Sequence, residues 1–322
     1  LETGTDMAVL KTGDESIYRY DQMGTHSYEN SSMQTGTNST SYYFSVASGD
    51  ITNFFNEVDL NTPWDYHYEN LDSRTILDRL AAVKYFVVKA GEEEYLPYGY
   101  DTLAAEVEKN DKLYRAYECK NALPIGYTYD SYIPEEKYAK MSTVEKQQAL
   151  LQGVILSNST VPETTSEFND REVPYKLVTG SGCREKDGKL IVTKENAQAK
   201  LVFDGLDECE TYLITEGVDY EALSPRELIS DKKWSKMTLY EQKKIQYENS
   251  TWRYWKESQK AYIDVTGQFL DKTISIFTDK YNAYSGRSDF LCNTGYSVKR
   301  KKSITLTFEN TGVYSYKNMK VV

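Results

Sequence analysis

The sequence predicts an α+β protein in which an N-terminal α/β-type unit precedes a β-sandwich of the jelly-roll or carbohydrate-binding-module type. Helical and strand patterns alternate in the first half, whereas short strands separated by turn residues fill the second half. We place the units at residues 6–160 and 161–322, because the polar segment 161–170 has the composition of a linker. A helical insert is expected at about 224–258.

The N-terminal unit opens with a polar stretch and then shows a helix followed at once by a strand. Residues 31–50 are polar but contain aromatics, which favours an ordered loop with short elements. Asp72 or Ser73 is a suitable N-cap for a helix with one apolar stripe. The run 83–88 has the β-branched and aromatic composition of a buried strand.

A further strand at 112–119 and a helix at 142–152 complete the expected elements of this unit. Ser142 and Glu145 have the spacing of a capping box, in which each side chain accepts a backbone N–H at the helix start.

The second unit is expected to be a β-sandwich because short apolar runs alternate with turn residues. Asn310, Thr311 and Gly312 predict a hairpin turn between the last two runs. The expected strands are 188–193, 199–203, 211–215, 261–267, 273–278, 303–308 and 313–321.

The insert is expected to start as a helix at the Ser-Pro pair 224–225, followed by Glu227. Residues 224–260 carry nine Lys and Arg against five Asp and Glu. Two interpretations follow. Trp252 and Trp255 pack the insert onto the sandwich while its lysines stay solvated, or the basic aromatic helix contacts anionic headgroups or a phosphate-bearing polymer.

Composition excludes some classes of function. Lys and Arg number 38 against 49 Asp and Glu, and the formal charge of −11 argues against a nucleic-acid partner. No run approaches the ~20 apolar residues that span a bilayer. Because the chain opens at Leu1 with neither Met nor a signal-peptide pattern, we expect the natural N-terminus to lie upstream.

The four cysteines, Cys119, Cys183, Cys209 and Cys292, are far apart and contain no C-x-x-C pair. This spacing gives a structural zinc site little support. Free, buried cysteines are the expected state. The alternative is a single bridge, for which Cys183–Cys209 is the favoured pair because it would link neighbouring β segments.

Motifs for nucleotide or nucleophile chemistry are absent from the sequence. There is no P-loop, no G-x-G-x-x-G and no G-x-S-x-G elbow. Asp65, His67 and Glu69 alternate, so an extended backbone would place all three on one face, either as a polar surface or as a metal or acid/base site. The acidic turn at 204–210 lacks the EF-hand spacing for calcium. We predict no metal and no cofactor.

The loop 18–67 holds the polar and aromatic groups that we expect to share a binding surface. The alternative is that these groups fix an ordered polar loop through hydrogen bonds. The candidate substrate-binding residues are Arg19, Asp21, His26, Asn30, Trp64 and His67.

Tyrosine is the compositional clue to a ligand class. The chain has 29 tyrosines, and aromatic faces among Asn, Asp and Thr suit carbohydrate, since rings pack on sugar C–H surfaces while polar groups bind hydroxyls. The alternative is that most of these rings cover sheets and half-buried faces.

Several segments, in a fixed order, resemble one known family. They are 18–45, 77–88 and 117–127, followed by 284–297 and 308–321. The matching residues are Arg19 and Asp21, Asn30 with Gly36 and Ser45, Val83-Lys84-Tyr85, and Asn121 to Gly126. In this order they resemble the extracytoplasmic domain of bacterial YfhO-type membrane proteins. The insert 224–260 and the cysteines depart most from that pattern.

The resemblance implies a multi-pass membrane glycosyltransferase of the GT-C type that takes sugar from a polyprenyl-phosphate carrier and modifies teichoic-acid-like envelope polymers. It implies flanking transmembrane helices, a location on the extracytoplasmic face of the bacterial membrane, and a role in acceptor recognition for this domain. The catalytic acidic residue is then expected outside this chain, which alone would be inactive. The alternatives are a non-catalytic cell-surface carbohydrate-binding or adhesion module and a secreted hydrolase with an unrecognised acidic pair.

Overall fold

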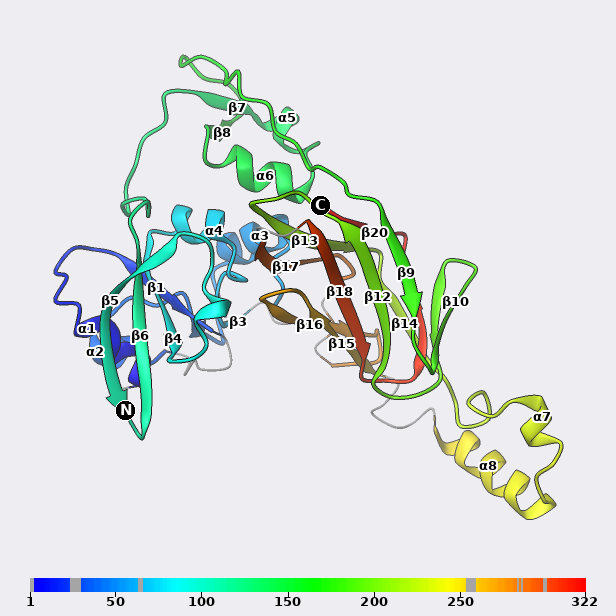
Figure 1. Ribbon diagram of the computed structural model, residues 1–322. Coiled ribbons are helices and arrows are strands. Elements are labelled where there is room, and N and C mark those ends of the chain that lie inside the picture. Colours follow the sequence, from blue (N-terminus) through cyan, green and yellow to red (C-terminus); the bar gives the residue numbers. More distant parts are fainter. Residues whose placement is uncertain are drawn as a thin grey trace. The chain divides into compact units, whose positions relative to one another are not determined.

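The computed structural model describes residues 3–23, 30–62, 66–252, 259–282, 284, 286–297 and 300–322. Helices and strands occur together in this part of the chain, which confirms the predicted α+β class. The chain divides into two compact units, residues 1–172 and 173–322, each built around its own sheets (Figure 1).

The first unit is built on a four-stranded mixed sheet in the order β1-β4-β6-β5. Strand β1 runs parallel to β4, and the other neighbours are antiparallel. The strands of this sheet are β1 (Arg19–Gln22), β4 (Val83–Lys89), β5 (Tyr100–Lys109) and β6 (Lys112–Cys119). Two shorter pairs are β2 (Tyr42–Tyr43) with β3 (His67–Tyr68) and β7 (Tyr132–Pro134) with β8 (Val154–Leu156). The helices are α1 (Gly4–Leu10), α2 (Ser32–Thr35), α3 (Gly49–Glu57), α4 (Thr75–Leu80), η2 (Glu93–Tyr95), α5 (Glu135–Tyr138) and α6 (Thr143–Ala149).

Both faces of the central strand β4 are buried, as its composition predicts. Phe86 and Val88 belong to one apolar cluster, while Tyr85 and Val87 belong to a second cluster with residues of α1.

Helix α1 was not predicted from the sequence pattern. This helix begins at a capping box between Thr3 and Asp6, and the Tyr20 hydroxyl donates a hydrogen bond to the buried Asp6 carboxylate. A polar network therefore anchors this short helix to the sheet.

One predicted helix start is correct and the other is wrong. The Ser142–Glu145 capping box is present at the start of α6. Neither Asp72 nor Ser73 caps α4, because both have left-handed backbones, with φ of 59° and 54°, and the helix begins after Arg74. The Asp72 carboxylate instead accepts the backbone N–H of Asn61 at 2.5 Å.

The side chain of Arg74 is fully buried, and its guanidinium binds groups in the segment that connects α3 to α4. It donates to the backbone carbonyls of Val58 at 2.5 Å and Asp59 at 2.6 Å, and to the Asp72 carboxylate at 3.1 Å. The Thr143 hydroxyl, at the start of α6, donates to the Asp59 carboxylate. One arginine thus joins the end of α3 to the start of α4, and α6 is tied to the same point.

The second unit is β-rich, as predicted, with three sheets in the orders β16-β15-β18-β12-β9, β17-β13-β20 and β10-β11-β19-β14. Strand β12 alternates buried and exposed residues along its whole length. Leu201, Leu213 and Leu190, one from each sheet, lie in a single buried core. The strands are β9 (Tyr175–Thr179), β10 (Cys183–Lys186), β11 (Lys189–Val192), β12 (Ala197–Asp204), β13 (Cys209–Glu216), β14 (Asp219–Ala222), β15 (Lys260–Thr266), β16 (Asp271–Phe277), β17 (Phe290–Ser297), β18 (Lys301–Phe308), β19 (Gly312–Ser315) and β20 (Asn318–Val321).

The C-terminal hairpin prediction is wrong. Strands β18, β19 and β20 belong to three different sheets, so the segment 310–312 carries the chain from one sheet to another. Gly312 is required there by a close approach to β14, because a Cβ at this position would lie 2.3 Å from the Tyr220 ring.

The insert is helical but begins later than predicted. Ser224 and Glu227 form a turn in which the Ser224 N–H and hydroxyl both donate to the Glu227 carboxylate, at 2.9 and 2.6 Å. The helices that follow are α7 (Asp231–Trp234) and α8 (Leu239–Trp252). No described residue of α8 is buried, so this helix is amply exposed to solvent.

All four cysteines are free, so the alternative Cys183–Cys209 bridge is not formed. Cys183 begins β10 and Cys209 begins β13, which lie in different sheets. Burial raises the pKa of the Cys183 thiol to about 11. Cys209 is only half-buried.

We expect Cys209 to react first when the native chain is pulsed with a maleimide at pH 8. At that pH a thiol with a pKa of about 11 is ionised in roughly one molecule per thousand, and the thiolate is the reactive form. Peptide mapping of the labelled chain measures this order. Equal labelling of Cys183 and Cys209, or recovery of a disulfide-linked peptide, would contradict it.

We expect Arg74→Met to lower the free energy of unfolding by about 3–5 kcal/mol, because it leaves the Asp72 carboxylate buried without its cation. Urea unfolding measures the loss. Arg115→Met is the matched control, since the Arg115 pairs with Glu93 and Glu106 are partly solvated, and it should cost much less. Equal losses in the two variants would show that the Arg74 network does not organise the unit.

Candidate functional site

Four of the six predicted site residues can be placed, and His26 and Trp64 lie outside the described residues. The Asp21 side chain is fully buried. Its carboxylate accepts the backbone N–H of Leu71 at 3.1 Å and of Gln22 at 2.7 Å. Asp21 therefore ties β1 to the segment that precedes α4 and is not exposed to a ligand.

Asn30 and His67 come together through Tyr43. The Asn30 amide donates to the Tyr43 carbonyl at 2.7 Å and accepts the Tyr43 N–H at 3.1 Å. Tyr43 pairs with His67 across β2 and β3, and the two rings lie 6.0 Å apart. The Asn30 side chain thus makes with the Tyr43 backbone the pair of hydrogen bonds that a neighbouring strand would make with β2.

Arg19 belongs to a different surface. Its guanidinium donates to the Ala81 carbonyl at 2.7 Å and lines an apolar groove together with Tyr42. Since neighbouring side chains in a strand point to opposite faces, Tyr42 and Tyr43 separate Arg19 from the Asn30–His67 pair.

Of the alternating residues Asp65, His67 and Glu69, the structure describes His67 and Glu69. Asp65 lies outside the described residues. Among those described, no group of three or more His, Cys, Asp or Glu side chains is placed to hold a metal ion.

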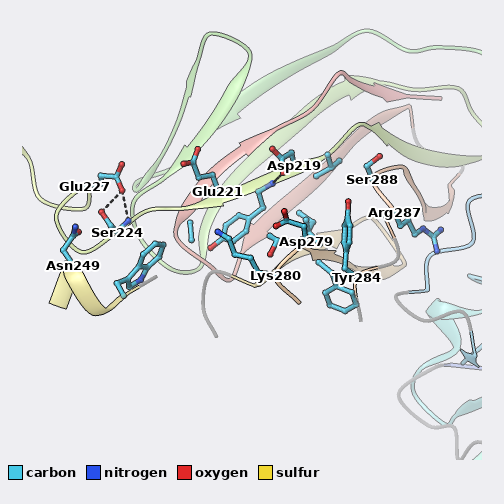
Figure 2. A pocket seen from close by; sticks show the side chains of 18 of the residues that line it. Asp219, Glu221, Ser224, Glu227, Asn249, Asp279, Lys280, Tyr284, Arg287 and Ser288 are labelled. Atoms are coloured by element: carbon cyan, nitrogen blue, oxygen red, sulfur yellow. Dashed lines mark hydrogen bonds between the residues drawn. The ribbon is translucent and has the colours of Figure 1, made fainter. Parts of the chain in front are cut away.

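The β-rich unit contains a polar pocket that the sequence did not single out, with a volume of about 960 Å³ (Figure 2). Its wall is formed by β14, the turn 224–227, the end of α8, the end of β16 with the residues that follow it, Tyr284 and residues 286–288. These segments are separated by up to several tens of residues, so their meeting depends on the sheet topology. The sequence feature that could have indicated this pocket is the high density of aromatic and acidic residues at 219–221 and 277–284.

Part of this wall is a fixed framework. The Tyr220 hydroxyl donates to the Thr311 carbonyl at 2.9 Å, and the Asn249 side chain accepts the Arg226 N–H at 3.2 Å. The Arg226 guanidinium stacks 4.4 Å from the Trp234 ring centroid and pairs with Asp231 at 2.8 Å. These contacts tie β14 to the segment before β19 and tie the turn 224–227 to α7 and α8, without using the other polar groups of the pocket.

Four exposed side chains in the pocket are available to a ligand. Among the described residues, Glu221, Asp279, Lys280 and Tyr284 make no side-chain hydrogen bond or ion pair with one another or with the framework. Figure 2 shows these groups along the same wall as Asn249 and Arg287. Two carboxylates, an ammonium and a phenol therefore remain free in a pocket that the half-buried Trp252 also lines.

The pocket is close to electrically balanced although the chain is acidic. The carboxylates that line it are Asp219, Glu221, Glu227 and Asp279, and the cations are Arg226, Lys280 and Arg287. Four negative and three positive groups leave a nominal charge of −1, against −11 for the whole chain. The charged and hydroxyl groups of the lining can donate hydrogen bonds to a polar ligand and accept them from it.

Among the described residues, no helix is long and apolar enough to cross a membrane.

Comparison with known proteins supports the family resemblance. The uncharacterized protein YfhO of Bacillus subtilis (strain 168) is 26% identical over 189 residues, which cover 58% of this chain and 21% of that protein. The chain thus matches about a fifth of that relative's length. The family described as "Bacterial membrane protein YfhO" matches residues 3–322, and the chain belongs to this family.

Proposed function

We propose that this chain is the extracytoplasmic domain of a multi-pass membrane glycosyltransferase that modifies teichoic-acid-like polymers of the cell envelope. The parent protein would take its sugar from a polyprenyl-phosphate carrier, and the β-rich unit would bind the acceptor polymer. The observation that supports this role is a pocket lined by Trp252 and by the free side chains of Glu221, Asp279 and Tyr284.

These groups suit an acceptor made of sugars and phosphates. Carboxylates accept hydrogen bonds from sugar hydroxyls, while the Tyr284 and Trp252 rings offer apolar faces to sugar C–H groups. Lys280 and Arg287 supply the cations that phosphate groups require. The near-balanced charge of the pocket would admit a polyanion that the chain's overall charge of −11 disfavours elsewhere.

A non-catalytic carbohydrate-binding or adhesion module is the alternative, and the same pocket favours it because binding needs no reacting group. The two proposals differ in what the full-length protein does. Given a polyprenyl-phosphate sugar and a teichoic-acid acceptor, a transferase modifies the acceptor whereas an adhesion module only binds it. In the transferase proposal the 322-residue chain alone shows no turnover, and sugar transfer by it would overturn that assignment.

We expect Trp252→Ala and Tyr284→Ala each to weaken binding of a short glycosylated poly(glycerol phosphate) about 2- to 13-fold. Each change removes one aromatic face worth about 0.5–1.5 kcal/mol. Isothermal titration calorimetry on the 322-residue chain measures the dissociation constants.

Tyr240→Ala and Tyr247→Ala are the matched controls, because both tyrosines are 71–79% exposed on α8 and neither lines the pocket. They should bind like the unsubstituted chain. Undetectable binding by the unsubstituted chain, or equal losses in the controls, would refute the acceptor role of this pocket.

A further inference from the structure

The charged residues that line the polar pocket of the β-rich unit fall into two groups, and the first group already has partners in the chain. Arg226 pairs with Asp231 at 2.8 Å and stacks on the Trp234 ring. The Glu227 carboxylate accepts hydrogen bonds from the N–H and the hydroxyl of Ser224. One cation and one carboxylate of the lining therefore belong to the framework of the wall.

Three further carboxylates of the lining form no ion pair within the described part of the chain. The side chains of Glu221 and Asp279 form no hydrogen bond there either. The Asp219 carboxylate accepts only the N–H of its neighbour Tyr220, at 2.9 Å. All three acidic residues are exposed. Because a carboxylate only accepts hydrogen bonds, these groups can bind the N–H and O–H donors or the positive charge of a ligand.

The cations that remain in the pocket are Lys280 and Arg287. The Lys280 side chain is exposed and forms no ion pair or hydrogen bond with any described residue. Arg287 Nε donates to the Asp289 carbonyl at 3.4 Å. In Figure 2 Lys280 lies in the middle of the wall and Arg287 at one end of it. Two positive and three negative groups are therefore left for a ligand, with a nominal charge of −1.

This balance disfavours a ligand whose charges are all negative. At equal distance a carboxylate repels a phosphate as strongly as an ammonium attracts it, so a phosphate gains at the cations about what it loses at the carboxylates. A ligand that also carries an ammonium can place it at the carboxylates and its phosphate at the cations. The charged groups that the framework leaves free then gain partners of opposite sign.

The aromatic residues of the pocket also favour an ammonium, because cations are attracted to the faces of Tyr and Trp rings. Tyr284, which is 50% exposed, lines the pocket together with Trp252. The first unit binds one of its own ammonium groups with the same residue types. The Lys84 ammonium pairs with the Asp14 carboxylate and lies 5.5 Å from the centroid of the Tyr85 ring. Carboxylate and tyrosine together thus already bind an ammonium in this chain.

We propose that the polar pocket selects an acceptor that carries an ammonium group in addition to phosphate, as a polyol phosphate with an unacetylated amino sugar does. The ammonium binds at Glu221 and Asp279, and the phosphate binds at Lys280 and Arg287. This inference rests on the proposed acceptor role of the pocket. It adds that the selectivity of the pocket comes from a positive charge on the acceptor.

Calorimetry on the 322-residue chain tests this selectivity at about pH 6, where such an amine is protonated. The ligands are three glycerol phosphate oligomers that carry glucosamine, N-acetylglucosamine or glucose. We expect the glucosamine oligomer to bind about tenfold tighter than the N-acetylglucosamine oligomer, as one charge-assisted contact provides. The glucose oligomer controls for the bulk of the acetyl group and should bind like the N-acetylglucosamine oligomer.

The outcomes separate this inference from the proposed function. Equal affinities for the three oligomers, or tighter binding of an uncharged sugar, would overturn the inference and leave the acceptor role of the pocket standing. Failure of all three oligomers to bind would refute the acceptor role and this inference with it.

Variants assign the two charges of the ligand to their partners. Glu221→Gln combined with Asp279→Asn should abolish the preference for glucosamine, while the N-acetylglucosamine oligomer binds at least as tightly because less repulsion acts on its phosphates. Lys280→Gln should weaken both ligands and keep the preference. Glu195→Gln combined with Asp187→Asn is the matched control, at exposed positions outside the pocket, and should change neither affinity. A retained preference in the first variant, or an equal loss in the control, would refute the proposal.

Discussion

The buried guanidinium of Arg74 is the constraint on which the first unit depends. It joins the backbone at Val58 and Asp59, where α3 ends, to the Asp72 carboxylate, just before α4 begins. Both helices line the apolar groove. The network fixes the end of α3 relative to the start of α4, because a buried cation with several hydrogen-bond partners cannot move without losing those bonds. Such a tie matters for α3, which buries no residue of its own.

The β-rich unit builds its pocket by a different physical route. Its apolar core draws on all three sheets, whereas the polar pocket is lined by β14, by the end of β16 and by residues of the insert. The pocket's framework contacts, from Tyr220 to Thr311 and from Arg226 to Asn249, are hydrogen bonds between segments far apart in the sequence. The free carboxylates and the free lysine then stand on a wall that is fixed without them, which is the preorganisation that favours ligand binding.

Local patterns in the sequence predict elements where one backbone rule acts alone, and fail where tertiary contacts decide. The Ser142–Glu145 box and the buried strand β4 follow from capping and composition. Strand β5 escapes such rules because its Ala and Glu residues lack β propensity, and pairing with β6 supplies its order. Asp72 is a suitable cap by residue type, yet Arg74 recruits its carboxylate. The sequence alone identified Arg19, because it is an ionisable residue in a polar loop. The pocket around Glu221 could not be predicted in this way, because only the sheet topology brings its segments together.

The high tyrosine content has a structural role that composition alone does not reveal. Among the 29 tyrosines, Tyr100, Tyr220 and Tyr314 have buried rings and hydroxyls that donate to backbone carbonyls. Tyr100 donates to Val83 at 2.9 Å and Tyr314 to Asn310 at 2.8 Å. Burial raises the pKa of both phenols, so they remain donors at any physiological pH. Tyrosine therefore replaces aliphatic residues in a chain of low apolar content, and only exposed rings such as Tyr284 are left for a ligand.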